Sequence, residues 1–444
     1  MTRIIKLHRG LDISLAGKAE ELLVPAERAH EYALLPSDFI GVKPRPVVKE
    51  GDKVKAGDAL FVNKDYPEVR FAAPVSGTVT TIERGERRKL LSIRIEADEQ
   101  QEYRKFAASD ETREKTIESL LEAGLFGYIN QLPYAISTNP QTMPRAIFVS
   151  AFRDMPLAGN FEFELRQGNK PDFQRGLTAL SKIAKVYLGI SIDAKEAILT
   201  TAKNVEITGF SGKCPAGNVG VQINHIAPIN KGEVVWTVDP TAVIFFGRLF
   251  NTGKVDLRRI VAVAGSEVER PSYRELLVGE SIAKAIPAPK EGTRIIMGNP
   301  LTGTVATAQS FLGAHTSEIT MIPEGDNADE LLGWIMPRTK QFSVNRSYFS
   351  WLMPKKEYTL DARIKGGERH MIMSGEYDRV LPMDIYGEYL VKAIIAKDID
   401  KMEQLGIYEV SPEDFALAEF VDSSKLELQR IVREGLDLVR KENE

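Results

Sequence analysis

The sequence predicts a multidomain protein of α/β and β structure, with a small β-sandwich, a doubly wound α/β domain, a small α+β module and a mainly helical C-terminal domain. The chain has 444 residues, which is more than one hydrophobic core usually serves. Residues 47–82 alternate apolar and polar positions between turns, as half-buried strands do. Residues 110–208 instead alternate helical periodicity with short apolar runs, the pattern of a parallel sheet covered by helices.

The β-sandwich is predicted from the turns in residues 47–79. Gly51 and Gly57 each lie in a polar turn where glycine tolerates positive φ, and Val54 between them can point inward. A third turn at residues 73–77 separates two runs of period-2 alternation. Two strand pairs that lie back to back are the expected product.

The first domain is expected to cover residues 1–100. Residues 6–11 and 25–37 are interpreted as further strands of the same sandwich. Residues 84–89 form a basic turn, which is interpreted as a solvated hairpin tip rather than a phosphate or lipid site.

The turn pattern resembles that of the biotinyl/lipoyl carrier domain, a barrel-sandwich module in which a hairpin lysine carries a covalent cofactor. Lys64 lies near the corresponding place. Its neighbours, residues 63–67, differ from the tight hairpin with Met or Asp that flanks the carrier lysine of that family. The residues therefore favour a solvated turn lysine on a structural sandwich over a modified lysine.

Residues 101–256 are predicted to form a Rossmann-like, doubly wound α/β domain. Asp110 is expected to cap a helix that ends at Gly124. Apolar runs without alternation predict buried parallel strands, and apolar residues on one helical face predict the helices between them. The expected strands are residues 146–149, 186–190 and 205–208, and the expected later helices are residues 172–186 and 194–203.

A loop at residues 209–220 follows the last of these strands and contains four glycines. Ligands of such sheets bind beyond the carboxyl ends of the strands, where glycines let backbone amides approach closely. The loop has no G-x-G-x-x-G or Walker motif and no signal for a following helix. It is therefore interpreted as a structural turn rather than a phosphate site.

Residues 257–335 are predicted to form the small α+β module. Short strands are expected at residues 258–263 and 293–298, with a short helix at residues 280–285 between them. This mixture of short elements indicates a unit of about 80 residues with its own sheet.

Residues 336–444 are predicted to form the mainly helical C-terminal domain. Ser411 begins a helix-cap signature of the form Ser-Pro-Glu-Asp. The last helix, residues 425–441, carries its apolar residues on one stripe. This stripe is interpreted as core packing rather than as a membrane-surface helix.

Composition argues against several classes of function. With 58 basic and 62 acidic residues, the chain has no net field that favours nucleic acid. The longest apolar run, residues 242–246, is far shorter than the roughly 18 residues that span a bilayer. The N-terminal residues lack the apolar core and cleavage site of a signal peptide, so the chain is expected in the cytoplasm.

Metal chemistry is also not expected. A single cysteine, Cys214, excludes a disulfide within the chain and an iron–sulfur cluster held by its cysteines alone. The five histidines lack the spacing of metal ligands, and only His225 lies near Cys214. Neither a metal site nor a catalytic residue is therefore predicted.

Several segments resemble the family of A subunits of the bacterial sodium-translocating NADH:quinone oxidoreductase. They are residues 49–52, 73–77, 144–151, 214–220, 247–253 and 380–385. The resemblance extends over the whole chain. The domain order is also similar to that of the C subunit of the Rnf electron-transport complex and, more distantly, of the NADH-binding flavoprotein subunit of respiratory complex I. This family resemblance implies that residues 257–335 form a β-grasp-like module.

The resemblance also implies which cofactors this chain lacks. The glycine-rich flavin loop of the more distant relatives corresponds to residues 122–130, where bulky Phe126, Tyr128 and Ile129 stand in place of glycine. The C-terminal helices contain none of the cysteines that hold clusters in those relatives. The chain is thus expected to bind no cofactor, with FMN, FAD, riboflavin and iron–sulfur centres only on partner subunits.

By the same resemblance, the chain is expected to be a peripheral subunit on the cytoplasmic face of the bacterial inner membrane. It is expected to dock on the membrane-embedded B subunit of the complex, where it contributes to the quinone-reduction end. Quinone is the expected ligand, and Phe39, Phe126, Tyr128 and His225 are the residue types that an apolar slot with a few donors requires.

Three other functions remain open from the sequence. The chain could be a purely structural docking subunit with no ligand, or an Rnf-type electron-transport subunit. It could also be an independent flavin-dependent NADH dehydrogenase, which would be yellow when purified. The B subunit of the complex and quinone are the partners expected under the first reading, and no nucleic acid is expected under any of them.

Overall fold

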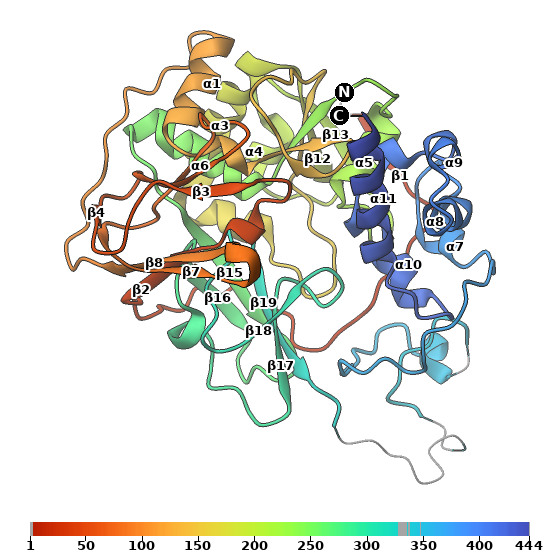
Figure 1. The fold of residues 1–444 in the computed structure, drawn as a ribbon. Helices are drawn as coiled ribbons and strands as arrows, with labels where there is room; N and C mark the ends of the chain where they lie inside the picture. Colours follow the sequence, from red (N-terminus) through yellow and green to blue (C-terminus); the bar gives the residue numbers. More distant parts are fainter. Residues whose placement is uncertain (1–2, 327–334, 336–337, 347, 444) are drawn as a thin grey trace.

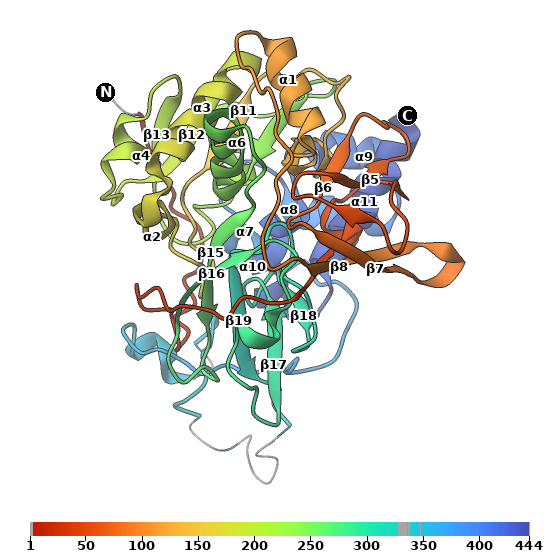
Figure 2. The same cartoon turned by 90° about the vertical axis from the view of Figure 1, so that its left-hand side faces the viewer.

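The computed structural model describes residues 3–326, 335, 338–346 and 348–443, and these residues form four β-sheets with helices around them (Figure 1). The sheets belong to a sandwich, to an α/β domain and to a five-stranded module, and the C-terminal residues are helical. Figure 2 shows the five-stranded sheet below the α/β domain, with the sandwich beside both.

The sandwich consists of a four-stranded sheet of order β2-β8-β7-β4 and a three-stranded sheet of order β3-β5-β6, as the turn pattern predicts. Val54 is buried between exposed Lys53 and Lys55. Phe61 and Phe71 stack in the core with ring centroids 4.4 Å apart. The elements are β2 (Glu31–Leu34), η1 (Pro36–Asp38), β3 (Pro44–Pro46), β4 (Lys53–Val54), β5 (Ala59–Asn63), β6 (Arg70–Ala72), β7 (Gly77–Arg84), η2 (Glu86–Arg88) and β8 (Leu90–Ala97).

The α/β domain is built on a seven-stranded sheet of order β1-β13-β12-β11-β14-β9-β10. Its first five strands run parallel, and the last two are antiparallel to their neighbours. The buried strands predicted at residues 146–149, 186–190 and 205–208 are confirmed. The strands are β1 (Arg3–Lys6), β9 (Ile129–Leu132), β10 (Ile136–Ser137), β11 (Ile147–Ser150), β12 (Val186–Ser191), β13 (Glu206–Ser211) and β14 (Val235–Val238).

Helices cover both faces of this sheet. On one face α3 and α6 cross closely and pack with α1 over the strands. On the other face α5 shares a core with the C-terminal helices. The helices are α1 (Arg113–Glu122), η3 (Phe126–Tyr128), α2 (Phe161–Glu164), η4 (Leu165–Asn169), α3 (Lys170–Ile183), α4 (Ala197–Thr201), α5 (Val219–Ile226) and α6 (Pro240–Thr252).

Two sequence-based assignments are wrong, one at the N-terminus of the chain and one at the start of α1. Residues 6–11 do not complete the sandwich; instead β1 pairs in parallel with β13, with Arg3 opposite Thr208. So short a strand has too little alternation to show which sheet it joins. Helix α1 is capped by Thr112, whose hydroxyl accepts from the Lys115 N–H at 3.3 Å, whereas Asp110 forms an ion pair with Arg175.

The third part is a five-stranded mixed sheet of order β16-β15-β19-β17-β18. The strands predicted at residues 258–263 and 293–298 are confirmed, and the predicted helix at 280–285 is a single turn. The β-grasp interpretation of this part stays a prediction, and residues 327–334 of it lie outside the described residues. The elements are β15 (Arg258–Ala264), β16 (Ser272–Leu277), η5 (Ile282–Lys284), β17 (Thr293–Met297), β18 (Thr304–Ala306) and β19 (Glu318–Pro323).

The C-terminal residues form short helices and one long one. Ser411 and Asp414 form the predicted capping box. The apolar stripe of α11 packs into the core with α8, as predicted. The elements are η6 (Phe349–Leu352), α7 (Tyr377–Val380), α8 (Gly387–Ile395), α9 (Ile399–Gln404), η7 (Ile407–Glu409), η8 (Pro412–Phe415), α10 (Ala416–Val421) and α11 (Leu428–Asn443).

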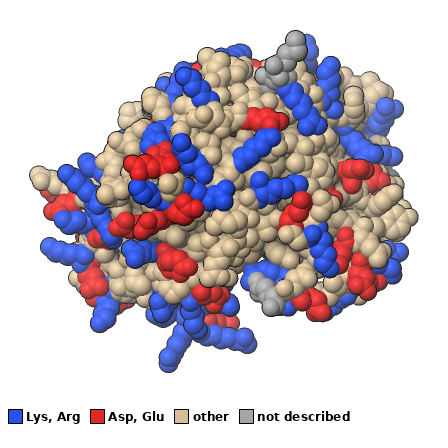
Figure 3. Space-filling model, turned by 90° about the horizontal axis from the view of Figure 1, so that it is seen from above, with Lys and Arg blue, Asp and Glu red and all other residues tan. Residues whose placement is uncertain are grey.

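The surface carries charges of both signs. On the face shown in Figure 3, basic and acidic side chains lie interspersed over most of the area. Within the described part of the chain, none of the helices has the length and apolar character that crossing a bilayer would require.

Candidate functional site

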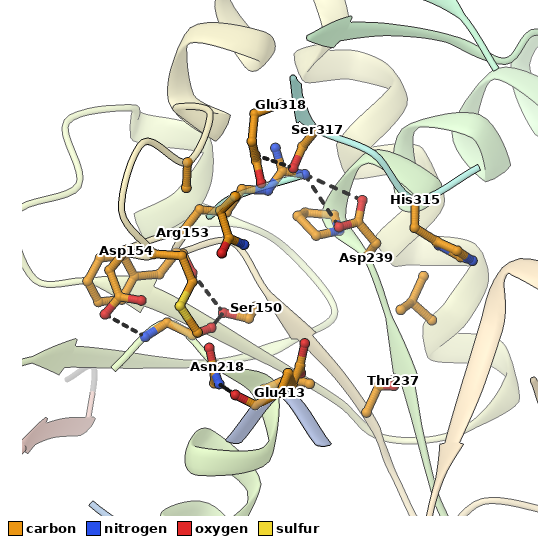
Figure 4. Close-up of a pocket in the computed structure, with 18 of the residues that line it drawn as sticks. Ser150, Arg153, Asp154, Asn218, Thr237, Asp239, His315, Ser317, Glu318 and Glu413 are labelled. Atoms are coloured by element: carbon orange, nitrogen blue, oxygen red, sulfur yellow. Dashed lines mark hydrogen bonds and ion pairs between the residues drawn. The ribbon is translucent and has the colours of Figure 1, made fainter. Parts of the chain in front are cut away.

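A cavity of about 300 Å³ lies at the carboxyl ends of β11 and β14 (Figure 4). These neighbouring strands mark the point where the strand order reverses, because the chain continues from β11 to β12 and β13 on one side and adds β14 on the other. A parallel sheet opens a crevice at such a point. The other walls come from the five-stranded module and from η8, so the cavity lies where three parts of the molecule meet.

Arg153 is the central cation of the cavity. Its guanidinium lies 3.4 Å from the carboxylate of Asp239 and 3.5 Å from that of Glu164, and it donates to the Thr241 hydroxyl at 3.0 Å. Asp239 is also the N-cap of α6, because its carboxylate accepts from the Thr241 N–H at 2.9 Å. The capping role fixes the carboxylate beside Arg153.

Buried charges in this group influence each other's pKa. Burial alone would raise the pKa of Asp239, but the charges of Arg153 and Arg259 outweigh burial and lower it. Burial raises the pKa of Glu164 despite the nearby Arg153. Arg259 lies behind the cavity with 2% of its surface exposed, and it donates to the Ala314 carbonyl at 2.7 Å. The cluster is therefore a nearly neutral network in which Asp239 stays ionised.

His315 forms an aromatic corner of the cavity. Its ring lies 5.8 Å from the ring of Phe39 and 5.6 Å from that of Tyr128, and both contacts are edge-on. Burial lowers the pKa of His315 to about 4, with the Asp239 charge opposing the shift. The imidazole is thus neutral at neutral pH, and it carries one N–H donor and one acceptor.

Two further carboxyl groups line the cavity with raised pKa values. Burial raises the pKa of Asp154 to about 6, although its Oδ2 accepts from the Gly217 N–H at 3.0 Å. Glu413 is exposed where it borders the cavity, and partial loss of solvation by the surrounding protein, together with the charge of Asp414, raises its pKa. Both groups can exchange protons near neutral pH.

The arrangement can therefore recognise and protonate a small polar ligand. Arg153 and the neutral His315 supply fixed donors, and Asp154 and Glu413 supply exchangeable protons. Among the residues that the structure describes, no group of three or more His, Cys, Asp or Glu side chains is arranged to hold a metal ion. Cys214 is buried, with its Sγ 3.6 Å from the Met155 Sδ.

The structure brings together two of the four residues predicted for quinone binding. Phe39 and Tyr128 are in edge contact, 5.4 Å between ring centroids, and both support His315 behind the cavity wall. Phe126 lies deeper in the core, against Trp236 at 5.6 Å. His225 lies near the far end of α5 from the cavity, and its Nδ1 is 3.0 Å from the Val221 carbonyl oxygen.

The segment at the flavin-loop position is packed tightly against the sandwich. Gly124 has a φ of +69°, and a Cβ there would lie 2.8 Å from the backbone nitrogen of Ala72. Phe126 and Tyr128 in η3 are buried in the same core. The bulky residues of residues 122–130 thus fill the space between two domains.

The predicted loop at residues 209–220 differs from the observed structure at both ends. Residues 209–211 belong to β13, and α5 begins at Val219 directly after the turn, although no helix signal was expected there. The turn itself borders the cavity through Gly217 and Asn218. The sequence placed this loop correctly beyond a strand end but did not predict the helix that starts from it.

The residues at the heart of the cavity were not predicted from the sequence. They are Arg153, Asp154, Asp239, His315 and Glu413. One signal was available: an apolar run at residues 234–238 is followed by Asp-Pro-Thr, which is a strand followed by an N-cap and a proline at N1. The others are single polar residues in separate segments.

Comparison with known proteins gives matches over the whole length. Residues 5–98 match the NqrA N-terminal barrel-sandwich hybrid domain, and residues 111–255 match the NqrA second alpha/beta domain. The A subunit of the Na(+)-translocating NADH-quinone reductase of Yersinia pestis is 35% identical over 99% of this chain and 100% of its own length. The protein of the same name from Neisseria meningitidis is 33% identical over the same shares.

Among solved structures, an NAD+-reducing [NiFe]-hydrogenase in the H2-reduced state aligns with a TM-score of 0.38 and 11% sequence identity. The alignment covers 75% of this chain and 61% of the hydrogenase chain. A TM-score this low supports no conclusion about function.

Proposed function

Because the chain belongs to the family of A subunits of Na(+)-translocating NADH-quinone reductases, we propose that it contributes to the quinone-reduction end of that complex without an FMN or iron–sulfur cluster of its own. The full-length match to relatives of that name is the observation that carries the proposal. In this proposal the chain lies on the cytoplasmic face of the membrane, docks on the membrane-embedded B subunit, and receives electrons from redox groups on partner subunits.

The cavity at the carboxyl ends of β11 and β14 is the proposed site of the quinone ring. Its volume of about 300 Å³ is at the lower end for ligand sites, so it suits a head group and leaves an isoprenoid tail outside. Arg153 and His315 are the proposed donors to the quinone carbonyl oxygens. Phe39 and Tyr128 hold His315 in place, while Phe126 and His225 have no direct role.

The carboxyl groups of the cavity fit the proton demand of the reaction. Reduction of a quinone to a quinol consumes two electrons and two protons, and it forms two O–H bonds. In the proposal both electrons come from redox groups elsewhere in the complex, and Glu413 and Asp154 pass protons to the carbonyl oxygens. Their raised pKa values keep part of each group protonated near neutral pH, and the accessible cavity allows them to take up protons again.

The test compares Glu413→Gln with Glu409→Gln in the purified multisubunit complex. Glu409 is partly buried four residues earlier, bonds to Asn224 at 2.8 Å and lies outside the cavity, so it controls for loss of a nearby carboxyl. We expect Glu413→Gln to lower kcat for quinone reduction about tenfold or more and to remove the fall in kcat at alkaline pH. Glu409→Gln should leave both unchanged.

A docking role without a ligand is the second candidate function. One observation favours it: Arg153, Glu164 and Asp239 already satisfy much of one another's charge, as in a structural network. If Glu413→Gln, Arg153→Gln and His315→Leu all keep wild-type kcat and KM for quinone in an intact complex, quinone binding in the cavity is refuted and the docking role stands.

A further inference from the structure

The described residues 338–346 and 348–357 form a surface stretch that we call the aromatic–basic segment. In Figure 1 it belongs to the light-blue part of the chain at the lower right, below α10. Within it the helical turn η6 presents three large apolar side chains to solvent. Phe349 is 50% exposed, Trp351 51% and Leu352 58%. Three neighbouring side chains of this size at half exposure form an apolar patch that water does not favour.

The segment is held in a defined shape from its inner side. The Ser350 hydroxyl accepts from the Ser343 N–H at 3.0 Å and donates to the Ser343 carbonyl at 3.2 Å. The ring of Phe342 packs against that of Phe420, with ring centroids 6.2 Å apart. Tyr358, directly after the segment, is buried and donates its N–H to the Ser14 carbonyl at 2.8 Å. The segment therefore has a buried side, which includes Ser350, while the neighbouring Phe349, Trp351 and Leu352 side chains remain exposed.

Basic residues surround the apolar patch. Residues 338–357 contain five basic residues and one acidic residue, Glu357, in a chain whose overall net charge is −4. Lys340 and Lys355 are exposed. The Arg346 guanidinium lies 5.3 Å from the Trp351 ring, and the Lys356 Nζ donates to the Thr339 carbonyl at 2.8 Å, which draws the two basic stretches together. The exposed apolar side chains and the basic side chains thus belong to the same surface segment.

We propose that the aromatic–basic segment binds the surface of a phospholipid bilayer that contains anionic lipids. Tryptophan and phenylalanine insert favourably at the depth of the head groups, and lysine and arginine attract anionic lipid over the distance of a Debye length. Protein–protein interfaces are depleted in lysine relative to the rest of a protein surface, so a surface that combines exposed aromatics with Lys340, Lys355 and Lys356 fits anionic lipid better than a protein partner. None of the described residues of the aromatic–basic segment lines the proposed quinone site.

The first test is flotation of the purified full-length chain with vesicles. We expect it to float with vesicles of phosphatidylcholine mixed with phosphatidylglycerol, and much less with phosphatidylcholine alone or at high salt. The double change Lys340→Glu and Lys355→Glu should weaken binding about tenfold or more, since it replaces two groups that attract the anionic surface with two that it repels. The triple change Phe349→Ser, Trp351→Ser and Leu352→Ser should abolish flotation.

Two matched variants control for general loss of apolar or basic surface. Tyr386→Ser with Tyr389→Ser removes side chains that are 70% and 58% exposed next to and within α8. Arg87→Glu with Arg88→Glu reverses charge at the hairpin tip of the sandwich. Both should float as the wild type does, and unchanged thermal unfolding of every variant shows that folding is retained.

The second test measures the depth of Trp351 directly. In a Trp334→Phe background the remaining tryptophans are Trp351 and Trp236, and Trp236 is fully buried and does not respond to lipid. Anionic vesicles should shift the emission of Trp351 to shorter wavelength, and brominated lipids should quench it. The proposal is overturned if the emission of Trp351 does not change or if the triple variant still floats. It is also overturned if the wild-type chain does not bind vesicles while the triple variant loses its partner subunits in detergent, because the patch would then be a protein interface.

Discussion

Asp154 has one carboxylate oxygen that accepts from the Gly217 N–H and one, Oδ1, that is buried without a hydrogen-bond partner among the described residues. The charged form of the group is therefore poorly stabilised, which agrees with the rise of its pKa to about 6. An acid whose folded pKa exceeds its ordinary value stabilises the fold while it is protonated. That contribution is fully present below about pH 4 and is lost as pH rises through about 6.

Asp154→Asn should therefore stabilise the protein above about pH 6. The amide keeps an acceptor for the Gly217 N–H and removes the cost of a buried charge. At about pH 8 we expect a gain of about 3 kcal/mol in the free energy of unfolding, seen as a higher Tm, because each pKa unit corresponds to about 1.4 kcal/mol. At about pH 4 the Tm of variant and wild type should coincide. A Tm gain that is equal at both pH values would show that ionisation is not its cause.

The sequence could supply only part of the candidate site at this scale. Phe39 and Tyr128 were predicted as aromatic residues of a quinone slot, and the structure brings them into contact beside His315. Arg153 and Asp239 were not predicted, because they are 86 positions apart and nothing in the sequence around either one distinguishes it from an ordinary surface charge. Only the folded structure brings the two side chains together. Composition and local sequence patterns do not show which distant charged residues come into contact.

At the scale of elements, the crossing of α3 and α6 depends on two glycines. A Cβ at Gly247 of α6 would lie 1.8 Å from the Asp172 carbonyl oxygen of α3, and a Cβ at Gly176 of α3 would lie 2.0 Å from the Val243 carbonyl oxygen of α6. Each helix thus supplies one glycine at the point where the other approaches. The crossing positions the N-terminus of α6, and with it Asp239, at the cavity.

Gly247→Ala should destabilise the protein although alanine favours helices. The gain in helix propensity is about 1 kcal/mol, whereas overlap with the backbone of α3 forces the helices apart at a cost of roughly 1–3 kcal/mol or more. We expect a lower Tm and a lower denaturation midpoint. Gly367→Ala is the control, because a Cβ there meets no atom within 4 Å. Equal stability of Gly247→Ala and wild type would mean that the crossing is looser than described.

Periodicity predicted the elements where it was strong. Three buried strands of the α/β sheet and the apolar stripe of α11 lie where the pattern placed them. Helix α5 was not predicted, because it has only eight residues and no side chain caps its N-terminus. Strand β1 was misassigned because a four-residue strand carries no information about its partner.

At the scale of the whole molecule, distant parts of the chain meet at one cavity. Its lining includes Ser150 at the end of β11, His315 from the five-stranded module and Glu413 from η8. A barrel-sandwich domain followed by an α/β domain could be predicted from sequence. The general rule that ligands bind beyond strand ends was also available. The packing of one domain on another could not be, because no local pattern encodes it.

The position of β1 makes a prediction at this scale. Removal of residues 1–11 deletes the edge strand of the seven-stranded sheet and exposes the backbone of β13. Amide hydrogen exchange should become faster in β13 (Glu206–Ser211), while β7 and β8 of the sandwich keep their protection. Loss of protection in β7 or β8 instead would place the N-terminal residues in the sandwich after all.

The pairing of Arg3 with Thr208 also bears on the order of events during synthesis. The first strand leaves the ribosome about 200 residues before its partner, so it waits unpaired while the sandwich between them can already collapse from local hairpins. A contact between such distant residues closes late, because the loop must first be ordered. We therefore expect the α/β sheet to gain its edge only after the sandwich is folded, with the N-terminal residues exposed to ribosome-associated chaperones until then.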